Sequence, residues 1–319
     1  MKVTNIEEIE YDGDTYNLHV EGNHNYFANN LVVSNCHRFA SDVTGDVVKC
    51  TTNCNTKLAF TGTLPECPVA KMELLGMFGN PVTYITSKEL IARGLATPVQ
   101  INTIFLKYTK QEVDYFKNNL KGYPKQLGFI KEHSRRNELV VNLLCNVKNI
   151  GNTLLLFSHT EHGKELFIST MKKLYPEVEV QSKDITGKNS FTFQEKYGVY
   201  FINGEDNAET REKTRKILEE HTNCILISNY QLLSTGVSIK ALFNLILASP
   251  LKSYTTVTQS IGRGMRLHKD KKLFQVYDLV DDFGVRTRGG IFYKQYQHRL
   301  NASYLPEDFP INEREFYLV

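Results

Sequence analysis

Two neighbouring residues near the start of the chain, Asn35 and Cys36, have side chains that can together break and rejoin a peptide bond. The side-chain amide of an asparagine can attack its own backbone carbonyl, which forms a succinimide and expels the amine of the next residue. A cysteine thiol has a pKa of about 8.5, so a few per cent is thiolate at neutral pH and can accept an acyl group. His24 is the candidate for moving protons, since an unperturbed imidazole has a pKa of about 6.5. We therefore expect residues 1–35 to be a removable processing element.

A second set of chemically capable residues, Gln259, Arg263 and Arg266, lies in the segment QSIGRGMR. The spacing of the two arginines predicts that both guanidiniums lie on one face of a helix, in its first turns. A guanidinium carries a permanent charge and a fork of donors that suits phosphate oxygens. Such a pair can stabilise the charge of phosphoryl transfer, a role worth about 10³-fold or more in rate. Taken alone, the segment is equally compatible with a solvated basic helix end.

Three further groups of small polar residues each follow a strand-like run: Thr61-Gly62-Thr63, Ser158-His159-Thr160 and Ser234-Thr235-Gly236. Hydroxyl, amide and imidazole groups beside strand ends suit contacts with nucleic-acid phosphates. Binding of that kind is independent of sequence and depends strongly on salt. Each group alone carries little information. Their joint order along the chain favours a functional role over ordinary turns.

Apolar runs alternating with helical patterns predict an α/β fold with a mainly parallel sheet from His37 onwards. Helices are predicted over Asn137–Val147 and after Ser158, where Phe167, Met171 and Leu174 share one face. The segment RGLATP, which includes Gly94–Pro98, predicts a domain boundary. Lys107–Lys131 predicts a surface insertion or a helix-loop segment. The predicted strands are Lys57–Phe60, Gln100–Leu106, Thr153–Phe157, Cys224–Ile227, Leu245–Ala248 and Phe274–Leu279.

The first 35 residues have a different, β-rich pattern. Tyr16, Leu18 and Val20 alternate with polar residues after a turn signal, and Leu31–Ser34 predicts a second short strand after the Asn29-Asn30 turn. This segment has too little apolar surface to fold alone, so we expect it to need a partner sheet.

Composition sets broad limits on the function. The chain has 319 residues, 41% of them hydrophobic, and a net charge of only +3, so a basic binding surface must be local. The start is acidic rather than secretory, and no run of about 18 apolar residues predicts a membrane span. The six cysteines match no common zinc spacing, so reduced thiols and a cytoplasmic location are expected, with no metal held by cysteine. Asp281-Asp282 is expected to be a charged strand end rather than a metal site.

The segment YNLHVEGNHNYFANNLVVSN, followed by Cys36, resembles the C-terminal end of inteins. The resemblance covers residues 1–36 and implies that Asn35 cyclises and that Cys36 is the first extein residue. Most inteins have a histidine before the final asparagine, whereas this chain has Ser34, which places more weight on His24. The first nucleophile of an intein is absent, so the segment resembles the C-terminal half of a split intein that acts in trans.

From residue 36 to about 290 the order of motifs resembles the second half of superfamily 2 helicases, most closely the UvsW-type helicases of phages. The resemblance implies that Cys36-His37 ends a D-E-x-H box, with His37 at the nucleotide. It implies that Thr61-Gly62-Thr63 couples the ATP and DNA sites, and that Ser234-Thr235-Gly236 contacts both nucleotide and DNA. It also implies that Gln259, Arg263 and Arg266 form the arginine-finger motif. Ser238 departs from the pattern, since many relatives have an aspartate there, and no G-x-x-x-x-G-K-[ST] motif occurs in the chain.

Together these features predict a split precursor. Residues 1–35 would be the intein fragment, 36–95 the remainder of a first RecA-like domain, and 96–319 a second RecA-like domain. The expected cofactors are ATP and Mg²⁺, with the main Mg²⁺ ligands on an N-terminal partner fragment, and the expected substrate is branched or single-stranded DNA. The alternative is a non-catalytic nucleic-acid-binding fragment with a decayed intein. No residues support a protease or a nuclease.

Overall fold

The computed structural model describes residues 25–28, 31–34, 61, 63–65, 67–82, 85–186, 190–204, 206–230, 239–284 and 290–319. The chain divides into two compact units, Met1–Tyr84 and Ile85–Val319. Within the described ranges, no helix is long and apolar enough to cross a membrane.

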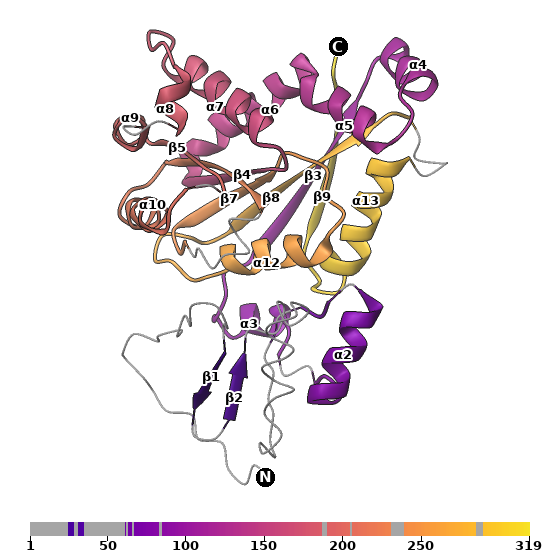
Figure 1. The fold of residues 1–319 in the computed structure, drawn as a ribbon, viewed down its shortest axis with the longest axis vertical. Coiled ribbons are helices and arrows are strands. Elements are labelled where there is room, and N and C mark those ends of the chain that lie inside the picture. Colours follow the sequence, from indigo (N-terminus) through magenta and orange to yellow (C-terminus); the bar gives the residue numbers. More distant parts are fainter. Residues whose placement is uncertain are drawn as a thin grey trace. The chain divides into compact units, whose positions relative to one another are not determined.

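In the first unit, the described residues include a short hairpin (Figure 1). Strands β1 (Asn25–Ala28) and β2 (Leu31–Ser34) pair in antiparallel register. The predicted strand over Leu31–Ser34 is confirmed, and its partner β1 was not predicted. The other strand residues predicted for this unit lie outside the described residues: Tyr16, Leu18, Val20 and Lys57–Phe60.

Helix α2 (Pro68–Phe78) also belongs to the first unit. It begins with a proline, whose missing N–H would have no partner at the first helical position in any case. It ends at Gly79, whose φ of 82° is a conformation that side chains with a Cβ rarely adopt.

The second unit is built on a seven-stranded sheet in which all neighbouring strands are parallel. Across the sheet the strands are β5 (Val199–Ile202), β6 (Ile225–Asn229), β4 (Asn152–Phe157), β7 (Leu242–Leu247), β8 (Phe274–Asp282), β3 (Val99–Lys107) and β9 (Ile311–Tyr317). This confirms the predicted α/β fold with a parallel sheet. The predicted apolar runs coincide with β3, β4, β6, β7 and β8, with shifts at their ends, whereas β5 and β9 were not predicted.

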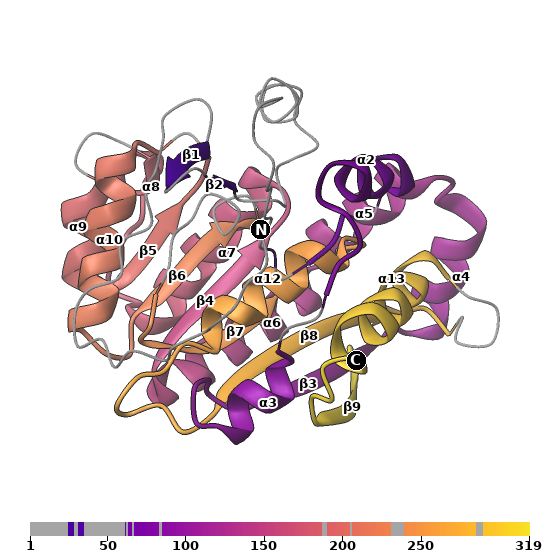
Figure 2. The same cartoon turned by 90° about the horizontal axis from the view of Figure 1, so that it is seen from below.

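Helices cover both faces of this sheet (Figures 1 and 2). Helices α6 and α7 lie on one face, where Phe167 shares a buried cluster with Leu155 of β4. Helices α12 and α13 lie on the other face, where Val257 shares a cluster with Leu154. Because successive side chains of a strand point to opposite faces, β4 contributes to both clusters, and all of its residues are buried. Among the described residues of this unit, the helices are α3 (Ser87–Ala92), α4 (Lys110–Asn119), α5 (Tyr123–Glu132), α6 (Ser134–Val147), α7 (Thr160–Leu174), α8 (Ser182–Thr186), α9 (Ser190–Tyr197), α10 (Ala208–Glu220), α12 (Tyr254–Gly264) and α13 (Ile291–Arg299), with the short 3-10 helix η2 (Lys148–Ile150) and the short π-helix η3 (Leu300–Tyr304).

The helices predicted over Asn137–Val147 and around Phe167 are confirmed as parts of α6 and α7. The segment Lys107–Lys131, predicted as a surface insertion or a helix-loop segment, is the second of these: it forms the end of β3, all of α4 and most of α5. Helix α4 begins with a capping box, in which Glu112 N donates to Thr109 Oγ1 and Thr109 N donates to the Glu112 carboxylate.

Candidate phosphate-contacting sites

Helix α12 presents two different faces. Ser253 caps its start by accepting a hydrogen bond from Thr256 N at 3.3 Å. The residues that pack on the sheet are Val257, Ser260, Ile261 and Gly264. Gln259 and Arg263 are four residues apart on the helix, so at about 100° of rotation per residue they project from the opposite side.

The arginine pair lies at the end of α12 and not in its first turns, so that part of the prediction is wrong. The cap at Ser253 starts the helix well before QSIGRGMR, which leaves Arg263 in the last turn and Arg266 beyond the C-cap residue Met265. Arg263 is half-buried and Arg266 is exposed. Burial, and then the neighbouring charge of Arg266, lowers the pKa of Arg263.

The loop after β4 carries Ser158, His159 and Thr160, which lie together at the carboxyl edge of the sheet. Ser158 N donates to Ser249 Oγ at 3.3 Å, and Ser158 Oγ lies 3.0 Å from His159 Nδ1. Both Ser158 and His159 are exposed, and Thr160 is the first residue of α7. Partial burial, and then the charge of Lys131, lowers the pKa of His159, which favours the neutral imidazole with one donor and one acceptor nitrogen.

A buried ion pair supports the same edge of the sheet. Arg136 Nε donates to Asp281 Oδ1 at 2.7 Å, and Arg136 Nη2 donates to the carbonyl oxygen of Ala248 at 2.8 Å. Tyr108 OH donates to the same Asp281 oxygen at 2.6 Å. Asp281 and Asp282 are the last residues of β8, as expected, and Asp282 forms an ion pair with Lys107. Among the described residues, no group of three or more His, Cys, Asp or Glu could hold a metal ion.

The structure does not bring the arginine pair and the β4 loop together. Ser158 follows the carboxyl end of β4, whereas the end of α12 lies at the amino ends of β3 and β8. There Thr97 N, just before β3, donates to the carbonyl oxygen of Met265 at 2.7 Å. A helix of the length of α12 spans about 16 Å, so the two groups of residues form separate sites.

In the first unit, Thr61 and Thr63 form a local turn. Thr61 Oγ1 donates to the carbonyl oxygen of Thr63 at 2.7 Å and accepts from Thr63 N at 3.2 Å. Thr61 is exposed and Thr63 is buried. The remaining predicted site residues lie outside the described residues: His24, Asn35, Cys36, His37, Gly62, Ser234, Thr235 and Gly236.

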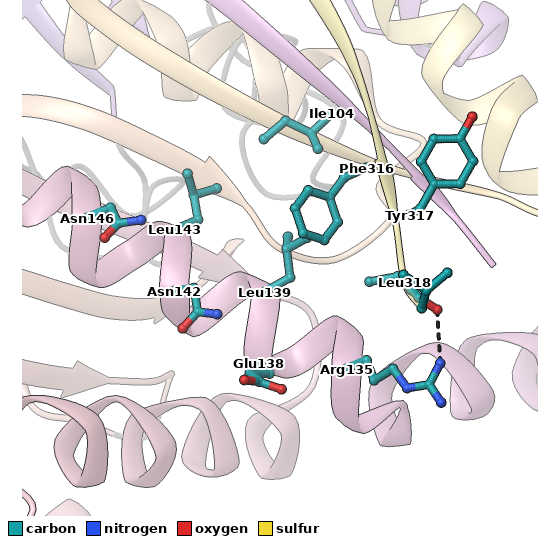
Figure 3. Close-up of a pocket in the computed structure, with 11 residues that line it drawn as sticks. Ile104, Arg135, Glu138, Leu139, Asn142, Leu143, Asn146, Phe316, Tyr317 and Leu318 are labelled. Atoms are coloured by element: carbon teal, nitrogen blue, oxygen red, sulfur yellow. Dashed lines mark hydrogen bonds between the residues drawn. The ribbon is translucent and has the colours of Figure 1, made fainter. Parts of the chain in front are cut away.

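A pocket of about 580 Å³ opens between α6 and β9, and none of its lining residues is a predicted site residue (Figure 3). Leu139, Leu143 and Phe316 give it apolar walls, and Arg135 Nη1 donates to the carbonyl oxygen of Leu318 at its edge. Its polar lining residues, Arg135, Glu138, Asn142 and Asn146, belong to none of the predicted motifs, so we do not assign the candidate site to this pocket.

Two residues at the candidate sites were missed by the sequence reasoning. Ser249, which accepts from Ser158 N, follows β7, and Arg136 fixes the end of β8 from α6. Neither residue lies in a motif. The only signal for Ser249 was its position as a polar residue directly after a buried strand, and Arg136 had no such signal.

No protein-family model matches the chain. The chain is 30% identical over 266 residues to the ATP-dependent DNA helicase UvsW of Enterobacteria phage T4. That match covers 82% of this chain and 48% of the helicase, so the chain spans about half the length of this curated relative.

Solved structures show the same relationship. The crystal structure of T4 UvsW is similar with a TM-score of 0.53 and 25% identity, over 90% of this chain and 54% of that chain. A fragment of an HsdR subunit of a type I restriction enzyme from Vibrio vulnificus shares the fold, with a TM-score of 0.62 and 19% identity over 91% of this chain and 48% of that chain. In both sequence and fold, the chain is thus similar to the phage helicase UvsW over most of its length.

Proposed function

We propose that the chain is part of an ATP-dependent DNA helicase of the UvsW type, in superfamily 2. The observation that carries the proposal is the arginine-bearing side of α12, which is turned away from the core of a parallel sheet similar to that of a phage helicase. The proposed organisation is that residues 36–95 complete a first RecA-like domain and that 96–319 form a second one. ATP would be the nucleotide, with most Mg²⁺ ligands on another part of the protein.

Arg263 and Arg266 would act on the phosphates of ATP. When bound, ATP supplies the phosphoryl group, and its transfer spreads negative charge over oxygens that two fixed guanidiniums can neutralise. Arg263 is half-buried, so its field is screened less by water than that of a fully exposed arginine. Gln259, one turn earlier on the same side, would orient the same phosphates by hydrogen bonding.

Ser158, His159 and Thr160 would contact the DNA backbone at the carboxyl edge of the sheet. The loop is separate from the end of α12, which supports the proposal that one site contacts DNA and the other acts in phosphoryl transfer. Thr61 and Thr63 in the first unit, with the predicted residues Ser234-Thr235-Gly236, would link the two events.

The test of this proposal is the DNA-stimulated ATPase activity of the protein formed from this chain and an N-terminal fragment that carries a P-loop. Arg266→Ala should lower kcat at least about 10³-fold. Arg314→Ala is the matched control, since Arg314 is an exposed arginine on β9, and it should leave the rate unchanged. Full ATPase activity of Arg266→Ala would show that Arg266 does not act on the phosphates of ATP.

Residues 1–35 would be the C-terminal fragment of a split intein, which joins the two halves by trans-splicing. Asn35 Nδ2 would attack the Asn35 carbonyl carbon, and the peptide bond to Cys36 would break with release of the Cys36 amine. The support is the residue pattern His24, Asn35 and Cys36 together with the hairpin β1–β2 upstream of the junction.

Mixing the chain with an N-terminal fragment that carries the other intein half should give a ligated product that lacks residues 1–35, measured by mass spectrometry. Asn35→Ala should block release of this segment. A chain that keeps its full mass beside an active partner would instead favour the alternative function, a nucleic-acid-binding fragment with a decayed intein.

A further inference from the structure

The arginine-bearing end of α12 is held from outside the helix by two buried side chains, Thr97 and Lys271. Their exposed fractions are 1% and 6%. A helix leaves its last carbonyl groups without N–H partners inside the helix, so other groups must satisfy them. Lys271 Nζ donates to the carbonyl oxygen of Gly264 at 2.8 Å, and Thr97 Oγ1 donates to that of Arg266 at 3.2 Å. Since Thr97 N also donates to the carbonyl oxygen of Met265, three successive carbonyls at this end are bound by groups outside the helix, and those of Thr97 come from a segment remote in sequence.

Lys271 is itself fixed on several sides. Its ammonium also donates to the carbonyl oxygen of Lys240 at 2.7 Å and lies 5.8 Å from the centre of the Phe274 ring. A positive charge is favourable at a helix C-terminus, where the carbonyl dipoles end. Burial lowers the pKa of Lys271 to about 8, against the opposing charge of Glu219, so the side chain is mostly protonated at neutral pH.

Thr97 connects the arginines to a different part of the fold. It lies in the segment between α3 and β3, directly before the strand, and Pro98 accepts a hydrogen bond from Phe274 N at 2.8 Å. The hydroxyl of Thr97 therefore ties the backbone of Arg266, which is outside the helix, to the start of the sheet.

We propose that Thr97 and Lys271 are positioning residues that fix the direction in which Arg263 and Arg266 leave the end of α12. The inference rests on the proposed function, because it assigns a use to the arginine pair. Neither residue contacts the reacting atoms; each acts through the backbone that carries a guanidinium.

The decisive comparison is Thr97→Val against Thr97→Ser, in the joined protein, by DNA-stimulated ATP hydrolysis. Valine keeps the shape and removes the hydroxyl, whereas serine keeps the hydroxyl. Thr97→Val should lower kcat about 3- to 10-fold, the effect of one hydrogen bond, and change KM for ATP less than about twofold. Thr97→Ser should retain the wild-type kcat. Lys271→Met, which leaves two carbonyls without a donor, should lower kcat about 10- to 100-fold.

Thr170→Val is the matched control. Thr170 is equally buried, but it lies on α7 at the other face of the sheet, and its hydroxyl donates to the carbonyl oxygen of Leu166 within the same helix. This variant should keep the wild-type kcat, so a fall seen only in Thr97→Val cannot be a general effect of removing a buried hydroxyl.

A second measurement on the chain alone is hydrogen exchange of the backbone amides in residues 261–267. Thr97→Val should speed exchange about 3- to 10-fold in this segment only, and Thr97→Ser should not. If the wild type is active and both Thr97→Val and Lys271→Met keep its kcat, the positioning role is overturned. Unchanged hydrogen exchange in Thr97→Val overturns it as well. A correctly joined wild type without ATPase activity overturns the proposed function and the positioning role with it.

Discussion

Replacing Gly264 by alanine should destabilise the protein, although alanine is the better helix former. Gly264 is the last residue of α12 and faces the sheet. An added Cβ would lie 2.0, 2.3 and 2.4 Å from Cζ, Cε1 and Cε2 of Phe274, a side chain with 0% exposure. Normal carbon contacts are about 3.5–4.0 Å, so either the ring or the helix end has to move.

The expected change in the free energy of unfolding of Gly264→Ala follows from two opposing effects. Alanine in place of glycine stabilises a helix by about 1 kcal/mol, whereas overpacking of a closed core costs about 1–3 kcal/mol. The overlap in Gly264→Ala is severe and the ring is fully enclosed, so the cost lies at the upper end. The expected net change is a loss of about 2 kcal/mol in the free energy of unfolding, measured by urea denaturation.

Gly262 supplies the matched control on the same helix. It is exposed, and an added Cβ there would meet nothing within 4 Å. Gly262→Ala should therefore stabilise the protein by up to about 1 kcal/mol. In the double variant with Phe274→Leu, the loss from Gly264→Ala should shrink, because the two residues are coupled. If Gly264→Ala is as stable as Gly262→Ala, the close approach of α12 to Phe274 is refuted.

Three further predictions concern the edge of the sheet. Asp281→Asn should lower the free energy of unfolding by about 3–5 kcal/mol, because it leaves the Arg136 guanidinium buried without its countercharge; a near-normal urea midpoint would contradict this. Burial, and then the charge of Arg136, lowers the pKa of His162 to about 3. An unfolded histidine titrates near about pH 6.5, so the contribution of His162 to the free energy of unfolding is complete above that pH and falls by about 1.4 kcal/mol for each pH unit below it. His162→Gln should therefore flatten the pH dependence of the urea midpoint between about pH 6.5 and 4, and an unchanged slope would reject this origin. Lys131→Ala should weaken binding of single-stranded DNA and reduce the slope of log affinity against log salt by about 0.7, measured by fluorescence anisotropy; an unchanged slope would show that Lys131 makes no phosphate contact.

The sheet was predictable where its strands are buried on both faces. The runs at Leu154–Phe157 and Ile225–Ile227 are continuously apolar because helices cover both sides, and this pattern needs no tertiary information. Strand β9 was missed because it is an exposed edge strand, INEREFY, in which charged residues replace the apolar run. Strand β5 was missed because four residues, Val199–Ile202, give too short a signal.

Helical periodicity places Gln259 and Arg263 on one side of α12, but it cannot place Arg266, which lies beyond the end of the helix. Their place along the helix was not predictable from the same segment. It depends on the cap at Ser253 and on Thr97 and Lys271, which bind the carbonyl groups at the other end from outside the helix.

The central claim is that this chain supplies the arginines of an ATP-dependent DNA helicase. The most direct test is ATP hydrolysis by the joined protein, with and without single-stranded or branched DNA, for wild type, Arg263→Ala and Arg266→Ala. We expect DNA-stimulated hydrolysis in the wild type and a loss of at least about 10³-fold in kcat for Arg266→Ala, with folding intact by urea denaturation. A joined, folded wild type that hydrolyses no ATP with any DNA, or an Arg266→Ala variant as fast as wild type, would contradict it.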